Sequence, residues 1–278
     1  RRTKPTYVID YPVAATPASA ETLGTFAHAG ECEIGAHLHP WVSPPYVEDV
    51  CTRNSYACNL DRAVEHEKIA GLKSAIQDGL RLTPRVYKAG RYGFGPATAD
   101  TLEDLGFDVD VSVNPHMNYS SDGGPVFDGL EPTLATFGRR RRLLEVPCTT
   151  GFAGVLRGSG DTLHRLASTP LGSRVRAVGI LARSGLLNKI MLSPEGSTLD
   201  EMIALTRALL DDGVRVFSLT FHSPSLKPGC TRYVSTTAAR DQFLDTIARY
   251  CDFFFERLGG VPSTPAALYD EWLRTNPS

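Results

Sequence analysis

The chain has 278 residues, of which 42% are hydrophobic and 22% charged, as in a soluble globular protein with a sizeable core. Its formal net charge of -2 argues against a general nucleic-acid binder. No stretch approaches the roughly 18 apolar residues of a transmembrane segment. The six cysteines form no C-x-x-C pair, which argues against a zinc ribbon or a thioredoxin motif. The compartment stays open between the cytoplasm and the cell envelope.

Strand-like and helix-like segments alternate along the whole chain. In the first part, we expect strands at residues 6–10, 33–37, 85–89 and 107–113, and helices at 19–29, 60–77 and 96–106. In the second part, we expect strands at 143–147 and 214–221, and helices near 161–167, 175–187, 197–210, 241–258 and 265–273. The run at 214–221 is apolar and rich in β-formers, which indicates a buried strand.

The alternation predicts a single α/β domain over residues 1–278, with no repeat and no low-complexity linker. A parallel sheet is expected, and a (β/α) barrel is favoured over a doubly wound sheet. Each cluster of polar residues follows a predicted strand. Parallel α/β folds place their chemistry at that edge, so these clusters are the candidate site.

A pair of histidines ends the predicted strand at 33–37. His37 and His39 are separated by one residue, and in a strand such positions point to the same side. Two neutral imidazoles side by side could bind one metal ion. The alternative is that one histidine belongs to the core and the other to the surface.

Three further loops carry groups suited to chemistry. In the glycine-rich turn at 90–95, Arg91 could hold a carboxylate, although a purely structural turn is the alternative. Asp110 lies on a polar strand face and could serve as a metal ligand or a base, unless that strand is a solvated edge. His222 follows the strand at 214–221 and could transfer protons, unless it is a core histidine. No G-x-S-x-G motif is present, which argues against a serine hydrolase of that type.

Together these segments resemble the NodB-type polysaccharide deacetylases, carbohydrate esterase family four, over essentially the whole chain. Residues 33–37 look like the family's E-I-G-x-H strand and residues 90–93 like its arginine-bearing motif. Residues 110–115 look like the strand that ends in D-S-S-x-x-P, and residues 219–222 like the L-x-H motif. The motifs occur in the same order as in the family.

The resemblance implies a deformed (β/α) barrel that binds a divalent metal, most readily zinc, and removes an N-acetyl group from an amino sugar or polysaccharide. His37 and His39 would be metal ligands and His222 the general acid. Arg91 would orient the base, and the backbone N–H of Tyr92 would help to bind the oxyanion. The side chains expected to contact the carbohydrate are Trp41, Tyr92, His116 and Ser223.

The chain departs from the family pattern at three points. The family's histidine motif is H-S/T-x-x-H rather than H-x-H, and Lys88 competes with Arg91 for the arginine's role. The aspartate pair of the first family motif, T-F-D-D-G, has no counterpart, so we expect the chain to lack its first βα unit. Asp10 is a poor replacement, and Asp110 is a partial substitute for the missing base.

Two other functions fit parts of the pattern. H-x-H after a barrel strand also opens the amidohydrolase-like metal hydrolases, but His66 and His164 fall within predicted helices instead of at strand ends. A non-catalytic carbohydrate-binding relative of the deacetylase fold is the second alternative. Aromatic side chains such as Trp41 could stack on sugar rings in either case.

Overall fold

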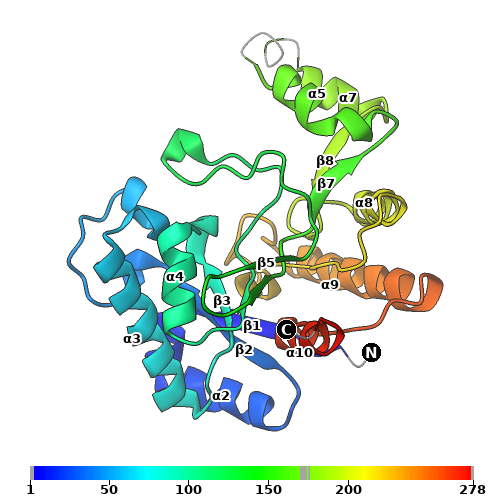
Figure 1. Ribbon diagram of the computed structural model, residues 1–278. Helices are drawn as coiled ribbons and strands as arrows, with labels where there is room; N and C mark the ends of the chain where they lie inside the picture. Colours follow the sequence, from blue (N-terminus) through cyan, green and yellow to red (C-terminus); the bar gives the residue numbers. More distant parts are fainter. Residues whose placement is uncertain (1–2, 170–173, 175, 277–278) are drawn as a thin grey trace.

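The computed structural model describes residues 3–169, 174 and 176–276, and its centre is a mostly parallel sheet (Figure 1). Five strands run parallel, and the last one in the spatial order is antiparallel to its neighbour. In spatial order they are β1 (Thr6–Ile9), β2 (Glu33–Leu38), β3 (Val86–Ala89), β4 (Val109–Asp110), β6 (Leu143–Glu145) and β5 (Ala135–Phe137).

Helices cover both faces of this sheet. One face carries α1 (Tyr11–Ala15), α2 (Pro17–His28), α3 (Arg62–Leu80) and α4 (Pro96–Asp104). Ile34, Ala36 and Leu38 alternate along β2 and share one core with Ile69 and Leu72 of α3. The opposite face buries Val86 and Val109 against α10 (Pro265–Thr275).

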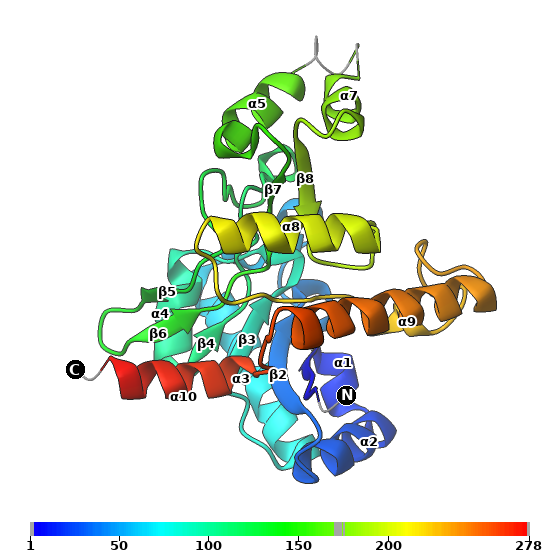
Figure 2. The same cartoon turned by 90° about the vertical axis from the view of Figure 1, so that its right-hand side faces the viewer.

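A second layer contains a two-stranded antiparallel sheet, β7 (Thr150–Ala153) and β8 (Asn188–Met191). It packs on α8 (Leu199–Asp211) and α9 (Thr237–Asp252) through a separate core. Thr198 and Glu201 form a capping box that starts α8. Beyond this layer, α5 (Gly160–Ala167) and α7 (Ala177–Arg183) project away from the rest of the molecule in both views (Figures 1 and 2).

Short helical turns connect these elements. They are η1 (Pro40–Val42), η2 (Arg53–Ser55), η3 (Ala57–Asn59), η4 (Gly90–Tyr92), η5 (Ser120–Asp122), η6 (Arg157–Ser159), η7 (Ser223–Leu226) and the π-helical turn η8 (Phe253–Arg257). Within the described residues, no helix is long and apolar enough to cross a membrane.

The parallel α/β architecture is confirmed, whereas a closed barrel is not found: the described strands form an open sheet with β1 and β5 at its edges. The prediction of a strand at 214–221 is wrong, because these residues form no strand. The amide of Thr220 donates to the carbonyl of Leu192, and that of Ser218 to the hydroxyl of Thr149. The apolar side chains of this segment pack into the core of the second layer and into the core beneath α10. Its hydrophobicity therefore reflects packing between layers and not hydrogen bonding in a β-sheet.

Candidate functional site

The candidate site lies at the carboxyl ends of β2, β3 and β4. Because these strands are parallel and adjacent, the residues that end them meet at one edge of the sheet. The register pairs His37 of β2 with Lys88 of β3. The strand positions that carry the polar motifs are therefore neighbours in space although they lie far apart along the chain.

His37 and His39 lie side by side, as their spacing predicts. Their ring centres are 4.4 Å apart, and the Nδ1 atom of His37 is 3.0 Å from the carbonyl oxygen of Lys88. Burial, with the neighbouring charges of His39 and Lys88, lowers the pKa of His37 to about 3. Burial also lowers the pKa of His39, despite the opposing charge of Asp10. Both rings are therefore neutral at pH 7, which is the state that binds metals.

Gly90 gives the His39 ring its place. A Cβ atom at residue 90 would collide with the His39 ring and would lie only 2.5 Å from the carbonyl oxygen of Leu38. Nδ1 of His39 is buried without a hydrogen-bond partner. Since Nδ1 of His37 is hydrogen-bonded to the Lys88 carbonyl, Nε2 is the ring nitrogen of His37 that remains to bind a metal ion. The glycine-rich turn thus has a steric role toward the histidine pair.

His222 belongs to the same electrostatic neighbourhood, because a positive charge on it lowers the pKa of both His37 and His39. It precedes η7, and its side chain is 75% exposed. Its Nδ1 is 2.7 Å from a carboxylate oxygen of Glu195, whose side chain is only 5% exposed. This contact raises the pKa of His222 against the effect of partial burial. An exposed imidazole that keeps its proton is suited to act as a general acid.

Glu195 is a site residue that the sequence reasoning missed. Its second oxygen accepts bonds from the backbone N–H of His222 and from the hydroxyl of Ser225. Burial would raise the pKa of Glu195, but the bonds from His222 and Ser225 outweigh it and lower the pKa. The sequence feature that could have identified Glu195 is its position as an acidic residue in the turn that follows β8. Ser223, expected to contact the carbohydrate, lies exposed next to this dyad.

Asp110 is fully buried at the end of β4, where a water or substrate does not reach it. Its oxygens accept bonds from the hydroxyl and the backbone N–H of Ser112. Burial raises the pKa of Asp110, and it raises the pKa of the adjacent Glu145 well above the usual range. Two buried carboxyls in contact share one proton more readily than they hold two charges. The role of Asp110 as a base stays a prediction that this placement does not favour.

Arg91 bonds to residues near η2 and to η5, and its role in orienting the base stays a prediction. Its guanidinium donates to the hydroxyls of Ser55 and Tyr56 and to the carboxylate of Asp122, at 2.8, 3.0 and 2.9 Å. The reason is local: Arg91 and Tyr92 both have positive φ, 53° and 62°, and this turn directs Arg91 toward η2.

Lys88, the other candidate for the arginine's role, acts electrostatically on Asp110. Its charge lowers the pKa of Asp110 against the larger effect of burial. Its Nζ donates to the carbonyl of Val111 at 2.8 Å and lies 3.7 Å from the sulfur of Cys148. The ring of Tyr92 lies 4.9 Å from this ammonium and stacks on Tyr119. Burial raises the pKa of Tyr92, so its phenol stays neutral.

His116 contributes to a different cluster. Its Nδ1 is 2.9 Å from the carboxylate of Asp161 on α5, and its Nε2 is 3.7 Å from that of Glu131. Its ring packs on Phe152. The structure thus places His116 in the loop that follows β4, where it contacts α5 through Asp161 and β7 through Phe152. Contact of His116 with a carbohydrate stays a prediction.

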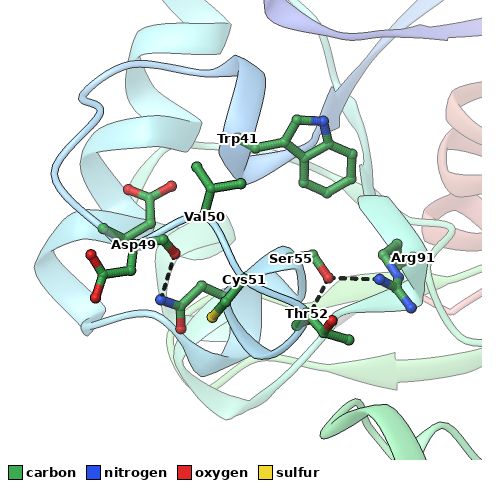
Figure 3. A pocket seen from close by; sticks show the side chains of 9 residues that line it. Trp41, Asp49, Val50, Cys51, Thr52, Ser55 and Arg91 are labelled. Carbon is green, nitrogen blue, oxygen red and sulfur yellow. Dashed lines mark hydrogen bonds between the residues drawn. The ribbon is translucent and has the colours of Figure 1, made fainter.

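A pocket of about 320 Å³ lies between Trp41 and Arg91 (Figure 3). Trp41, whose ring centre is 4.6 Å from that of His39, lines it together with Arg91. Residues 48–52 and the polar side chains of Asn54 and Ser55 complete its wall. An aromatic ring next to hydrogen-bonding groups is the usual lining of a site for a small organic ligand.

The residues present fit part of a metal site. The imidazoles of His37 and His39 are neutral and adjacent, as zinc ligands must be. A catalytic zinc site takes three protein ligands, however, and the described part of the chain holds no group of three or more His, Cys, Asp or Glu side chains arranged for a metal. Asp10 acts electrostatically on His39 but its carboxylate caps α1 through Val13.

Comparisons with known proteins add a likeness in structure. No protein-family model and no curated protein matches the chain. Among solved structures, a presumed polysaccharide deacetylase from Mycobacterium smegmatis is similar with 17% identity and a TM-score of 0.44, over 94% of this chain and 75% of that one. IcaB from Ammonifex degensii is similar with 25% identity and a TM-score of 0.23, over 33% of this chain and 38% of that one.

Proposed function

We propose that the protein is a metal-dependent hydrolase that removes an N-acetyl group from an amino sugar or polysaccharide. The observation that carries this proposal is the position of two neutral imidazoles, His37 and His39, within electrostatic reach of the His222–Glu195 dyad. Amide hydrolysis needs a water that attacks the carbonyl carbon and gives up a proton, a centre that activates that carbonyl, and an acid that protonates the leaving amine. The site offers groups for the last two.

In this proposal His37 and His39 supply two ligands of the metal, most readily zinc. A bound divalent metal supplies Lewis-acid polarisation of an amide carbonyl. Gly90 keeps room for the His39 ring, and the Lys88 carbonyl fixes the orientation of His37. Both are the kind of support that orients metal-binding histidines.

His222 acts as the general acid. Its Nδ1–H donates to Glu195, which leaves Nε2–H to protonate the amine as the C–N bond breaks. The buried Glu195 carboxylate stabilises the imidazolium before transfer and orients the ring. The backbone N–H of Tyr92 is proposed to help bind the developing oxyanion, and Trp41 and Ser223 to contact the sugar.

Titration of the protein with zinc chloride in a calorimeter, with an assay of acetate released from N-acetylglucosamine oligomers, tests this proposal. We expect one zinc site that is lost in the double variant His37→Ala/His39→Ala and kept in the control His66→Ala. Replacement of His222 by Ala should lower kcat by about 10²- to 10⁴-fold, as expected for loss of a general acid. Unchanged zinc binding in the double variant, or unchanged acetate release without His222, would contradict it.

A non-catalytic carbohydrate-binding protein is the second candidate. It is favoured by the incomplete set of metal ligands among the described residues and by the pocket beside Trp41. This function predicts that glycan binding persists in the presence of a chelator and is lost in Trp41→Ala, with no acetate released by the wild-type protein.

A further inference from the structure

The part of the molecule formed by α5, α7 and the residues that flank them exposes many apolar side chains. We call the described residues 155–169, 174 and 176–186 the α5–α7 lobe. Val155 is 82% exposed, Leu166 66% and Ile180 57%. The exposed apolar side chains of the lobe are Val155, Leu156, Leu166, Val178, Ile180 and Leu186. Isolated exposed apolar residues are normal, but a concentration of them in one projecting segment marks an interaction surface.

The lobe is also strongly basic in a protein that is slightly acidic. Residues 155–186 contain five arginines and a single acidic residue, whereas the whole chain has a net charge of -2. That acidic residue, Asp161, is bonded to His116. Four of the arginines, Arg165, Arg174, Arg176 and Arg183, are exposed. The surface therefore presents positive charge together with apolar side chains.

Arginine and apolar residues lie close together along the lobe. Arg183 follows Ile180 by three residues along α7, so the two side chains are neighbours on the helix surface. Arg165 directly precedes Leu166 on α5. Arginine can lay its aliphatic stem along apolar surface while its guanidinium stays with polar groups. This combination of basic and apolar residues on short helices is typical of elements that lie in a membrane interface.

The position of the lobe in the fold allows such contact. α5 and α7 stand at the far end of the molecule from the central sheet in both views (Figures 1 and 2). A flat surface could therefore reach them without contact to the carboxyl edge of β2, where His37 and His39 lie. We propose that the α5–α7 lobe docks the protein on a lipid surface that carries anionic headgroups.

The charge complementarity favours lipid over a protein partner. An anionic headgroup layer satisfies scattered arginines at any spacing, and its acyl boundary accepts single apolar side chains. A folded protein partner would need acidic groups placed to match each arginine and pockets placed to match each apolar side chain. This docking is independent of the hydrolase proposed above, because no residue of the lobe belongs to that site.

Flotation with lipid vesicles tests the proposal on the whole chain. We expect the protein to float with vesicles of phosphatidylcholine mixed with phosphatidylglycerol and not with phosphatidylcholine alone. Loss of two positive charges in Arg165→Gln/Arg183→Gln should weaken binding at least about tenfold, and added salt should do the same. The charge control Arg249→Gln/Arg274→Gln, on α9 and α10, should bind like the wild-type protein.

The apolar contribution is tested by Leu166→Asp/Ile180→Asp, with Leu244→Asp/Val261→Asp as the control at exposed apolar positions outside the lobe. We expect only the first variant to lose vesicle binding. Circular dichroism and thermal unfolding verify that each variant is folded. Wild-type protein that does not bind the anionic vesicles at low salt would overturn the proposal, as would a folded lobe variant that binds normally. A concentration-dependent dimer in sedimentation equilibrium that is broken by the lobe variant, without vesicle binding, would overturn it in favour of self-association.

Discussion

At the scale of single residues, the site depends on a buried carboxylate that holds an exposed imidazole. Glu195 bonds to the ring and the backbone of His222 and to the hydroxyl of Ser225. The charged form of His222 is favoured by this contact, which raises its pKa. A raised pKa extends the acid form of the ring to higher pH, and the acid is lost when the pH rises through that pKa.

Replacement of Glu195 by Gln should move the alkaline limb of the pH profile of kcat/KM to lower pH. The amide removes the negative charge that stabilises the imidazolium, so the acid form of His222 is lost earlier as the pH rises. At pH 8 we expect kcat/KM to fall about tenfold or more. Acetate release measured across the pH range tests this, with Glu271→Gln on α10 as the control. An alkaline limb that stays in place would show that Glu195 does not control the proton of His222.

At the scale of elements, a buried lysine fixes the segment between β2 and α3. The Nζ atom of Lys68 on α3 is fully buried and donates to the carbonyls of Pro40, Ser43 and Pro45. It also forms an ion pair with the carboxylate of Glu48 at 3.0 Å. The segment clamped in this way carries Trp41 and part of the pocket wall. α3 therefore positions one side of the candidate site although none of its residues enters it.

The variant Lys68→Met should lower the free energy of unfolding by about 3–5 kcal/mol, because it leaves a nearly buried carboxylate and three carbonyls without their partner. Urea unfolding measures this loss, with the exposed Lys4→Met as the control. The double variant Lys68→Met/Glu48→Leu should recover part of the loss, since the uncompensated charge is then absent. A loss below about 1 kcal/mol, the size seen for exposed ion pairs, would show that the clamp is dispensable.

At the scale of the whole molecule, buried titratable groups make stability depend on pH in two opposite directions. Burial raises the pKa of Glu65 to about 7, so its contribution to stability is complete below 4.5 and is lost as the pH rises through 7. The pKa of His37 is lowered to about 3, so its contribution is complete above 6.5 and is lost as the pH falls through 3. The net profile of the protein is the sum of such groups.

The variant Glu65→Gln isolates one of these contributions. Glutamine does not titrate, so the variant should lack the decline in stability that Glu65 causes in the wild-type protein between about pH 5 and 8. The difference in unfolding free energy, wild type minus variant, should therefore fall by about 3 kcal/mol over that range. Urea unfolding at a series of pH values measures it, and Glu67→Gln, exposed on the same helix, is the control. A difference that stays constant with pH would contradict the buried, protonated state of Glu65.

Several elements were predictable from the sequence because they depend on residues close together in the chain. The apolar spacing of α3 and α8 gave helices at nearly the right bounds, and the alternation of strands and helices indicated a parallel sheet. The prediction of a strand at 214–221 failed because hydrophobicity alone does not distinguish a buried β-strand from an irregular segment packed between two cores. Likewise, the sequence predicts helices near α5 and α7, but only the structure shows that several of their apolar side chains are exposed.

For the site, the sequence by itself determined the histidine pair, since an i, i+2 spacing at the end of a strand places two side chains together whatever the rest of the fold does. Only the tertiary structure decided the partners. Glu195 meets His222 across 27 residues of chain, and Asp110 meets Glu145 on a neighbouring strand. Arg91 bonds to Ser55 of η2 from a turn in which the φ angles of Arg91 and Tyr92 are both positive. Contacts of this kind depend on which segments the packing of the layers brings side by side, and a local pattern does not contain that information.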